Sequence, residues 1–306
     1  MRTALTAITD ELKRLKATGV KSVAVSDESV SILRRVIAAR APKTGERKPE
    51  TGKVEPVPVS RPSAPVPVPV KSAPKVVAAS KLPAPPVVVL PAGDKAARWA
   101  WLHDLVLNHP VCTANVRPGK KVVLGVGSLD AKIMFVGEAP GAEEEIQGEP
   151  FIGPAGQLLT KMIAGMGLKR ADIYIGNIMN WRPQAPTPAG AEQIGNRAPT
   201  AEEMAFCMPF LRAQIEIVNP DMLVALGSTA AQGLLGVGSF KNLGDIRGKW
   251  AQFMDKPVMV TYHPSYLLRP PVDNRKKRLV WEDLLKVMER SALPISDKQR
   301  AYFLDK

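Results

Sequence analysis

Short apolar runs alternate with amphipathic segments through the second two thirds of the chain. Four runs are apolar enough to be strands buried on both faces, and they cover 132–136, 172–177, 222–226 and 258–262. Apolar residues recur at helical spacing over 155–167, 200–218, 228–235 and 275–291. Apolar strands separated by helices predict an α/β fold, namely a three-layer α/β/α sandwich around a central four-stranded parallel sheet.

Each predicted strand ends in a turn rich in glycine or polar residues. The four turns read GEAPG (137–141), GNIMNWRP (176–183), GSTA (227–230) and HPSYLLR (263–269). Ligands of open parallel sheets bind beyond the carboxyl ends of the strands. We therefore expect these turns to converge on one crevice.

The first third of the chain has a different pattern. Residues 1–40 hold two short amphipathic stretches and form a predicted helical segment, a candidate site for a protein partner. Residues 41–93 contain 13 Pro, no aromatic residue, and eight Lys or Arg against three Glu, which predicts a basic disordered linker. Residues 94–306 are the predicted catalytic domain, and they open with a helix expected to bury Trp99, Trp101, Leu102, Leu105 and Leu107.

Charge favours a polyanionic partner. The formal net charge is +13 and the isoelectric point is near 9.8, so nucleic acid is the favoured partner class. No run approaches the roughly 20 apolar residues of a membrane span, and the first residues lack the apolar core of a secretory signal. We therefore expect a cytoplasmic protein with no membrane partner.

Five blocks in this order resemble the uracil-DNA glycosylase superfamily, most closely the branch called family 4. The blocks are GEAPG with GEPFIGPAGQLL (148–159), YIGNIMNWRP (174–183), NRAPT (196–200), RGKW (247–250) and HPSYLLR. The resemblance covers about residues 105–287. It implies an enzyme that removes uracil from DNA after turning the nucleotide out of the stack.

The resemblance also implies roles for pocket residues. Phe151 would stack on the extruded base, and the Asn177 amide, which both donates and accepts, would pair with uracil N3 and O4. His263 would donate to uracil O2 as negative charge develops there, helped by backbone amides of the turn that holds Gly137 and Ala139.

Five carboxylates cluster around the first turn. Cleavage of the glycosidic bond leaves positive charge on the sugar, and Glu138 and Glu144 fall on the two family positions for acids that stabilise this cation or activate water. The resemblance leaves open which of the two orients water. Glu143, Glu145 and Glu149 are expected to form a solvated acidic rim.

The resemblance implies DNA contacts in two turns. In the HPSYLLR loop, Leu267 or Leu268 would fill the gap left by the flipped nucleotide, and Arg269 would lie near a phosphate. Pro264 would make the loop rigid. The expected contacts are Pro264, Ser265, Leu267, Leu268, Arg269 and, at a helix N-terminus, Ser228.

The chain departs from the family 4 pattern at its metal site. Family 4 enzymes hold an iron-sulfur cluster with four cysteines, but only Cys112 and Cys207 are present and Trp181 stands where a cysteine is usual. We expect no cluster, no other metal or organic cofactor, and apolar side chains in the vacated space. Residues 184–193 resemble an insertion that reshapes the rim facing DNA. Residues 239–250 lack the histidine through which a related branch attaches covalently to DNA.

The expected activity is that of a monofunctional uracil-DNA glycosylase on single- or double-stranded DNA, leaving an abasic site for base excision repair. Two alternatives stay open. One is an enzyme of the same fold that acts on hypoxanthine or xanthine, and the other is a DNA lesion or single-strand binding module without catalysis.

Overall fold

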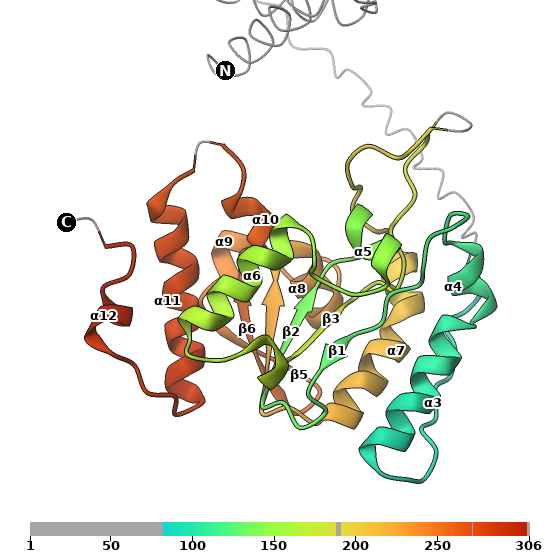
Figure 1. The fold of residues 1–306 in the computed structure, drawn as a ribbon, viewed down its shortest axis with the longest axis horizontal. Helices are drawn as coiled ribbons and strands as arrows, with labels where there is room; N and C mark the ends of the chain where they lie inside the picture. Colours follow the sequence, from blue (N-terminus) through green and yellow to red (C-terminus); the bar gives the residue numbers. More distant parts are fainter. Residues whose placement is uncertain (1–81, 188–190, 271, 305–306) are drawn as a thin grey trace, which may run out of the picture. The chain divides into compact units, whose positions relative to one another are not determined.

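A computed structural model describes residues 82–187, 191–270 and 272–304 (Figure 1). They form an α/β structure around one six-stranded sheet with strand order β1-β3-β2-β4-β6-β5. Residues 1–81 lie outside the described part, and so do the predicted helical segment and most of the predicted linker. None of the described helices is long and apolar enough to cross a membrane.

The four predicted strands form the parallel centre of the sheet. They are β2 (Ile133–Gly137), β3 (Tyr174–Asn177), β4 (Met222–Leu226) and β6 (Lys256–Thr261). Two edge strands, β1 (Val126–Gly127) and β5 (Trp250–Phe253), pair antiparallel with β3 and β6. The prediction of four strands was incomplete because β1 has only two residues and β5 is half-buried, so neither makes an apolar run.

Helices cover both faces of the sheet. One face packs against α3 (Lys95–Leu107), α7 (Ala201–Val218) and α8 (Gly227–Leu235), and the other against α6 (Pro154–Gly165), α10 (Pro264–Leu267) and α11 (Asn274–Arg290). Shorter helices are α4 (Pro110–Ala114), α5 (Ala142–Gln147), the 3-10 turn η1 (Arg170–Asp172), α9 (Leu243–Ile246) and α12 (Asp297–Arg300). The predicted α/β/α sandwich is confirmed.

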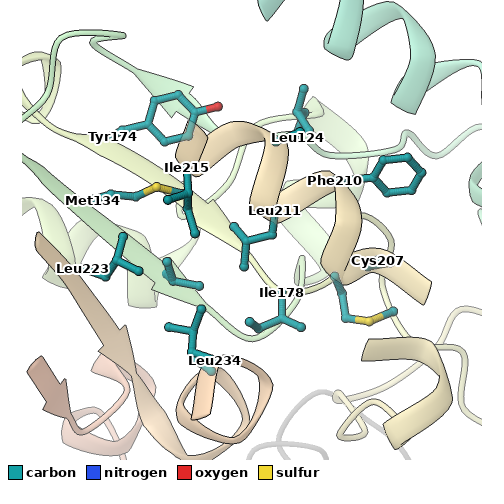
Figure 2. Packing of buried hydrophobic residues seen from close by; sticks show 14 of the residues in the cluster. Leu124, Met134, Tyr174, Ile178, Cys207, Phe210, Leu211, Ile215, Leu223 and Leu234 are labelled. Atoms are coloured by element: carbon teal, nitrogen blue, oxygen red, sulfur yellow. The ribbon is translucent and has the colours of Figure 1, made fainter. Parts of the chain in front are cut away.

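Alternation along the strands divides the core in two. Met134 and Val136 of β2 belong to the same core cluster as Leu211 and Ile215 of α7. Figure 2 shows Met134 beside Ile215. Phe135, between them in sequence, faces the second cluster with α6 and α11. Burial on both faces explains why these strands read as continuous apolar runs.

The folded part begins earlier than predicted. Val88 and Leu90 pack against the first core cluster, and Arg98 Nε donates to the Pro91 carbonyl across 3.1 Å. Residues 82–93 therefore belong with the folded part instead of with the linker. In α3, Leu102 and Val106 are buried, whereas Trp101 is 38% exposed, so the expectation that Trp101 is a core residue was wrong.

Candidate active site

A pocket of about 720 Å³ opens at the carboxyl ends of the four parallel strands. The turns after β2, β3, β4 and β6 all contribute to its walls, as expected from their positions in the sequence. Nine of the predicted site residues line it, namely Glu138, Ala139, Glu144, Phe151, Asn177, Ser228, His263, Ser265 and Arg269. A pocket of this size has room for a nucleotide-sized ligand.

Gly137 lets two site residues approach each other. It is the last residue of β2 and pairs in register with Asn177, the last residue of β3. A Cβ on Gly137 would stand 2.4 Å from Phe151 Cζ and 2.5 Å from Asn177 Oδ1, distances that real Cβ atoms do not show. Gly137 does not line the pocket. Because it has no side chain, it leaves room for the Phe151 ring and the Asn177 amide.

A second glycine, Gly156, lets helix α6 pack closely against Phe151. Phe151 has φ 55°, an uncommon left-handed conformation for a bulky residue, and is only 6% exposed. A Cβ on Gly156, in the first turn of α6, would lie 1.9 Å from the Phe151 carbonyl oxygen. Helix α6 therefore packs directly against the backbone of Phe151 at this position.

The Asn177 amide is buried without a full set of partners. Its side chain is 6% exposed, and its Oδ1 makes no hydrogen bond with any described residue. Most buried polar atoms are hydrogen-bonded, and an unpaired one costs about 1–3 kcal/mol. Because Asn177 lines the pocket and its amide oxygen has no partner, the amide is suited to pair with a polar ligand.

His263 is held with a defined tautomer. Its Nδ1 accepts from the backbone N–H of Ser265 across 3.2 Å and lies 2.8 Å from the Ser265 hydroxyl oxygen. An amide N–H can only donate, so Nδ1 carries a lone pair and the neutral ring has its proton on Nε2. Its ring centroid lies 5.6 Å from that of Phe151, with 32° between the ring planes.

The charge state of His263 follows from its surroundings. The pKa of the ring is lowered from 6.5 to about 4, first because the ring is buried and second because Arg269 is positively charged, while Glu144 opposes the shift. The ring is therefore neutral near pH 7. The turn that follows β4 approaches it closely, because a Cβ on Gly227, at φ 92°, would lie 2.9 Å from His263 Cβ.

The two glutamates with predicted roles have different surroundings. Glu144 Oε2 accepts from the Gly141 N–H across 3.0 Å, and Oε1 accepts from the N–H groups of Ile152 and Gly153 across 3.1 and 3.0 Å. Glu144 thereby ties the turn after β2 to the loop that carries Phe151. The Glu138 carboxylate lines the pocket and has no hydrogen-bond or ion-pair partner among the described residues.

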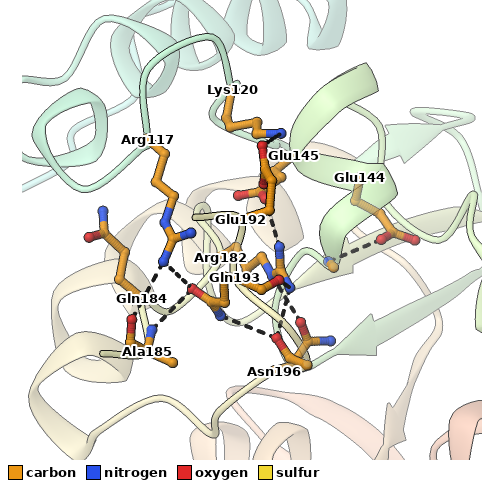
Figure 3. A network of polar contacts seen from close by, with 12 residues as sticks. Arg117, Lys120, Glu144, Glu145, Arg182, Gln184, Ala185, Glu192, Gln193 and Asn196 are labelled. Carbon is orange, nitrogen blue, oxygen red and sulfur yellow. Dashed lines mark hydrogen bonds and ion pairs between the residues drawn. The ribbon is translucent and has the colours of Figure 1, made fainter. Parts of the chain in front are cut away.

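The expected acidic rim needs a correction. Glu143 and Glu149 are exposed, but Glu145 is 4% exposed and pairs with Arg182 across 2.7 Å (Figure 3). A buried carboxylate needs such a partner, because an unpaired buried charge is strongly unfavourable. The α5 pattern did not reveal this pair, since the arginine lies 37 residues away in the chain.

The loop after β6 separates its two leucines. Leu267 is 6% exposed and packs in the second core cluster, which favours Leu268 over Leu267 as the expected DNA wedge. Leu268 is 43% exposed and Arg269 is exposed. Pro264 is buried as the first residue of α10, where it shapes the turn without lining the pocket.

Sequence reasoning missed several pocket residues. Tyr262 and Tyr266 stack with centroids 4.7 Å apart and an interplanar angle of 26°, and both line the pocket. Lys276 lies over the Tyr266 ring at 4.9 Å. The sequence signal that could have indicated them is the pair of aromatic residues, Tyr262 and Tyr266, on both sides of His263 and Pro264. The other missed residues include Arg182, Asn196 and Leu243.

The residues near the expected cluster position do not fit an iron-sulfur cluster. Such a cluster is held by four thiolates, whereas Cys112 and Cys207 are both fully buried, and burial raises the pKa of the Cys112 thiol to about 12. Trp181 is 1% exposed and packs 6.0 Å from Phe206, centroid to centroid. The described residues contain no group of three or more His, Cys, Asp or Glu that could hold a metal ion.

Fold and site together define a three-layer α/β protein with a pocket at the carboxyl ends of its parallel strands. An aromatic ring, a buried amide and a neutral imidazole converge at the strand ends. The family model of the uracil DNA glycosylase superfamily matches residues 124–285, a span that contains all of these groups. The chain belongs to this superfamily.

Relatives of known type agree with the family 4 resemblance. The type-4 uracil-DNA glycosylase of Thermotoga maritima is 45% identical over 166 residues, which is 54% of this chain and 80% of the relative. That of Pyrobaculum aerophilum is 38% identical over 176 residues, 56% of this chain and 84% of the relative. A type-5 uracil-DNA glycosylase of Pyrobaculum aerophilum is 29% identical over 170 residues, 54% of this chain and 73% of the relative.

Proposed function

We propose that this protein is a monofunctional uracil-DNA glycosylase. It hydrolyses the N-glycosidic bond of deoxyuridine in single- or double-stranded DNA and leaves an abasic site for base excision repair. The names of the type-4 relatives support the activity. The observation that carries the substrate assignment is the buried Asn177 amide, whose oxygen lacks a partner beside Phe151.

Base recognition follows from the pocket geometry. The flipped uracil lies against the Phe151 ring, and the Asn177 amide accepts from N3–H and donates to O4. Cytosine offers an acceptor at N3 and a donor at its amino group, so the same amide orientation opposes it. A mismatched base would leave the buried amide unpaired, which makes discrimination large.

His263 acts as a neutral donor. Its Nε2–H donates to uracil O2, and the bond strengthens as negative charge develops on the leaving base. A neutral imidazole is favourable when no substrate is bound, because a buried imidazolium cation would cost desolvation free energy. The Ser265 N–H fixes the tautomer that this role requires.

The two acids divide the work. Glu138, whose carboxylate is unpaired, orients water toward the sugar carbon and stabilises the positive charge that develops there. Glu144, with three backbone hydrogen bonds, positions Phe151. The different surroundings of the two carboxylates support this division of roles.

DNA contacts surround the pocket mouth. Leu268 fills the space left by the flipped nucleotide, and its exposure of 43% supports this role. Arg269 binds a phosphate, with Ser265 beside it in the loop. Ser228, exposed at the first turn of α8, presents helix N-terminal amides to a second phosphate.

The proposed reaction needs no cofactor. Hydrolysis uses water, a donor and a carboxylate, all of which side chains supply. We infer that the enzyme works without an iron-sulfur cluster, as the cysteine pair and the packed Trp181 support. The purified protein should be colourless and free of iron. Stoichiometric iron with absorption near ~400 nm would contradict this inference.

Three matched oligonucleotides test the activity. They carry uracil, hypoxanthine or xanthine at one position, and alkali converts abasic sites to strand breaks. We expect the unmodified protein to produce strand breaks only in the uracil oligonucleotide. Asn177→Ala should lose most of this excision activity. The melting temperature of the variant protein should be unchanged, because the substitution removes a buried group that has no partner. Breaks with only hypoxanthine or xanthine would assign another base, and binding without breaks would favour a non-catalytic module.

A further inference from the structure

The most exposed large apolar side chain in the described part of the chain lies at the pocket rim. Ile194 is 97% exposed, in the loop between β3 and α7. Gly195 and Asn196, the next two residues, line the pocket. A single exposed apolar residue is ordinary on a protein surface. Ile194 differs from such ordinary exposed residues in two ways: it lies beside the pocket, and hydrogen bonds fix the backbone on both sides of it.

The residue before Ile194 is anchored in the protein. Gln193 is 7% exposed, and its Oε1 accepts from Arg117 Nη2 across 2.8 Å and from the Ala185 N–H across 3.0 Å (Figure 3). Its Nε2 donates to the Pro183 carbonyl across 3.1 Å. The Gln193 side chain thus joins the beginning and end of the loop to the segment before β1.

The backbone on both sides of Ile194 is held by one buried guanidinium. Arg182 Nη2 donates to the Gln193 carbonyl across 3.2 Å and to the Gly195 carbonyl across 2.7 Å. Arg182 is itself 5% exposed and neutralised by Glu145. The backbone around Ile194 is therefore fixed from below while the side chain points to solvent, which lowers the entropy cost of using it in a contact.

The Ile194 loop faces the same side of the molecule as the loop with Leu268. In Figure 1 the yellow segment after β3 and the orange-red connection between α10 and α11 both rise beyond the strand tips, to the right and left of them. The pocket is lined from both loops, by Asn196 on one and Arg269 on the other. DNA that places a nucleotide in the pocket must pass between them.

We propose that Ile194 is a second DNA wedge. Its side chain packs against the bases or sugars beside the flipped nucleotide, on the side of the pocket away from Leu268. Flipping unstacks the neighbouring bases at a cost of a few kcal/mol per step, and an apolar side chain in contact with their exposed faces offsets part of it. This inference rests on the proposed function, because it assigns a DNA contact to the same site.

Ile194→Ala and a matched control test the wedge. The control is Met254→Ala, 44% exposed in the turn between β5 and β6, at the opposite end of the parallel strands. We expect Ile194→Ala to lower the single-turnover excision rate on duplex uracil DNA about tenfold, from loss of partly buried methylene contacts. The excision rate of Ile194→Ala on single-stranded uracil DNA should fall much less, because this substrate has no partner strand to open. Met254→Ala should match the unmodified protein on both.

A crosslinking experiment separates this inference from the activity. A photoreactive amino acid at position 194 should crosslink to duplex DNA that carries an abasic-site analogue, at a nucleotide next to the analogue, while the same group at position 254 should not. If the protein crosslinks to DNA through position 194 but excises no uracil, the proposed function is overturned, while the contact between residue 194 and DNA still holds. No crosslink, or equal rates for Ile194→Ala and Met254→Ala on duplex DNA, would overturn the wedge.

Discussion

The backbone N–H of Ser265 donates to Nδ1 of His263 across 3.2 Å, and this bond sets the chemistry of the ring. It leaves the proton of the neutral imidazole on Nε2. Burial and the nearby Arg269 favour the same neutral form, because both lower the pKa of His263. The donor thus has one protonation state throughout the neutral pH range.

The pH dependence of excision should reflect this low pKa. A group with a pKa of about 4 is neutral at pH 7 and gains its proton only as the pH falls through about 4. We expect the single-turnover rate on single-stranded uracil DNA to show no step near ~6.5, where an ordinary histidine titrates, and to fall only below pH ~5. A step near pH ~6.5 that follows the His263 resonance in NMR would contradict the assignment.

Removing the charge of Arg269 should raise the pKa of His263. The guanidinium disfavours a second positive charge nearby, so Arg269→Gln relieves this effect and moves the pKa toward its ordinary value. NMR titration of the three histidines measures the shift. Arg275→Gln, an exposed arginine of α11 outside the pocket, is the control and should leave the pKa unchanged.

The two glutamates should differ when each is changed to glutamine. Glu138→Gln should slow excision by about 10²- to 10⁴-fold, the range for a lost acid-base group, without a change in melting temperature. Glu144→Gln puts an NH₂ group where a backbone N–H needs an acceptor, so it should lower stability by about 1–3 kcal/mol. Thermal unfolding and single-turnover rates separate the effects, and equal melting temperatures would contradict this division of roles.

Gly137→Ala should impair the site while the sheet stays intact. Its methyl group would stand 2.4 Å from Phe151 Cζ and 2.5 Å from Asn177 Oδ1, so both side chains must move. We expect an excision rate lower by at least about 100-fold, because a displacement of about 1 Å has such an effect on a catalytic group. Gly244→Ala is the control, since its Cβ would meet no atom within 4 Å. Similar rates for both variants would refute the packing argument.

Trp181 should be important for stability. The side chain is 1% exposed among Phe206 and other core residues. Trp181→Ala should lower the free energy of unfolding by about 3–5 kcal/mol, as large-to-small core substitutions do. Urea unfolding measures this change, and Trp101→Ala, at a 38% exposed position of α3, is the matched control. A cost of less than about 1 kcal/mol would show that Trp181 has no packing role.

The sequence by itself determined the parallel strands, the main helices and the place of the pocket. Strands buried on both faces must be apolar throughout, so β2 and β4 are visible as runs without any knowledge of their neighbours. Because the carboxyl ends of parallel strands meet at one edge, the turns with Glu138, Asn177 and His263 had to converge.

Only the tertiary structure decided what each polar group contacts. Glu145 and Glu138 look alike in sequence, yet one is buried with Arg182 and the other is unpaired in the pocket. Leu267 and Leu268 are neighbours, yet one packs in the core and the other is exposed. Burial and partner choice depend on residues far away in the chain, and local periodicity carries no information about them.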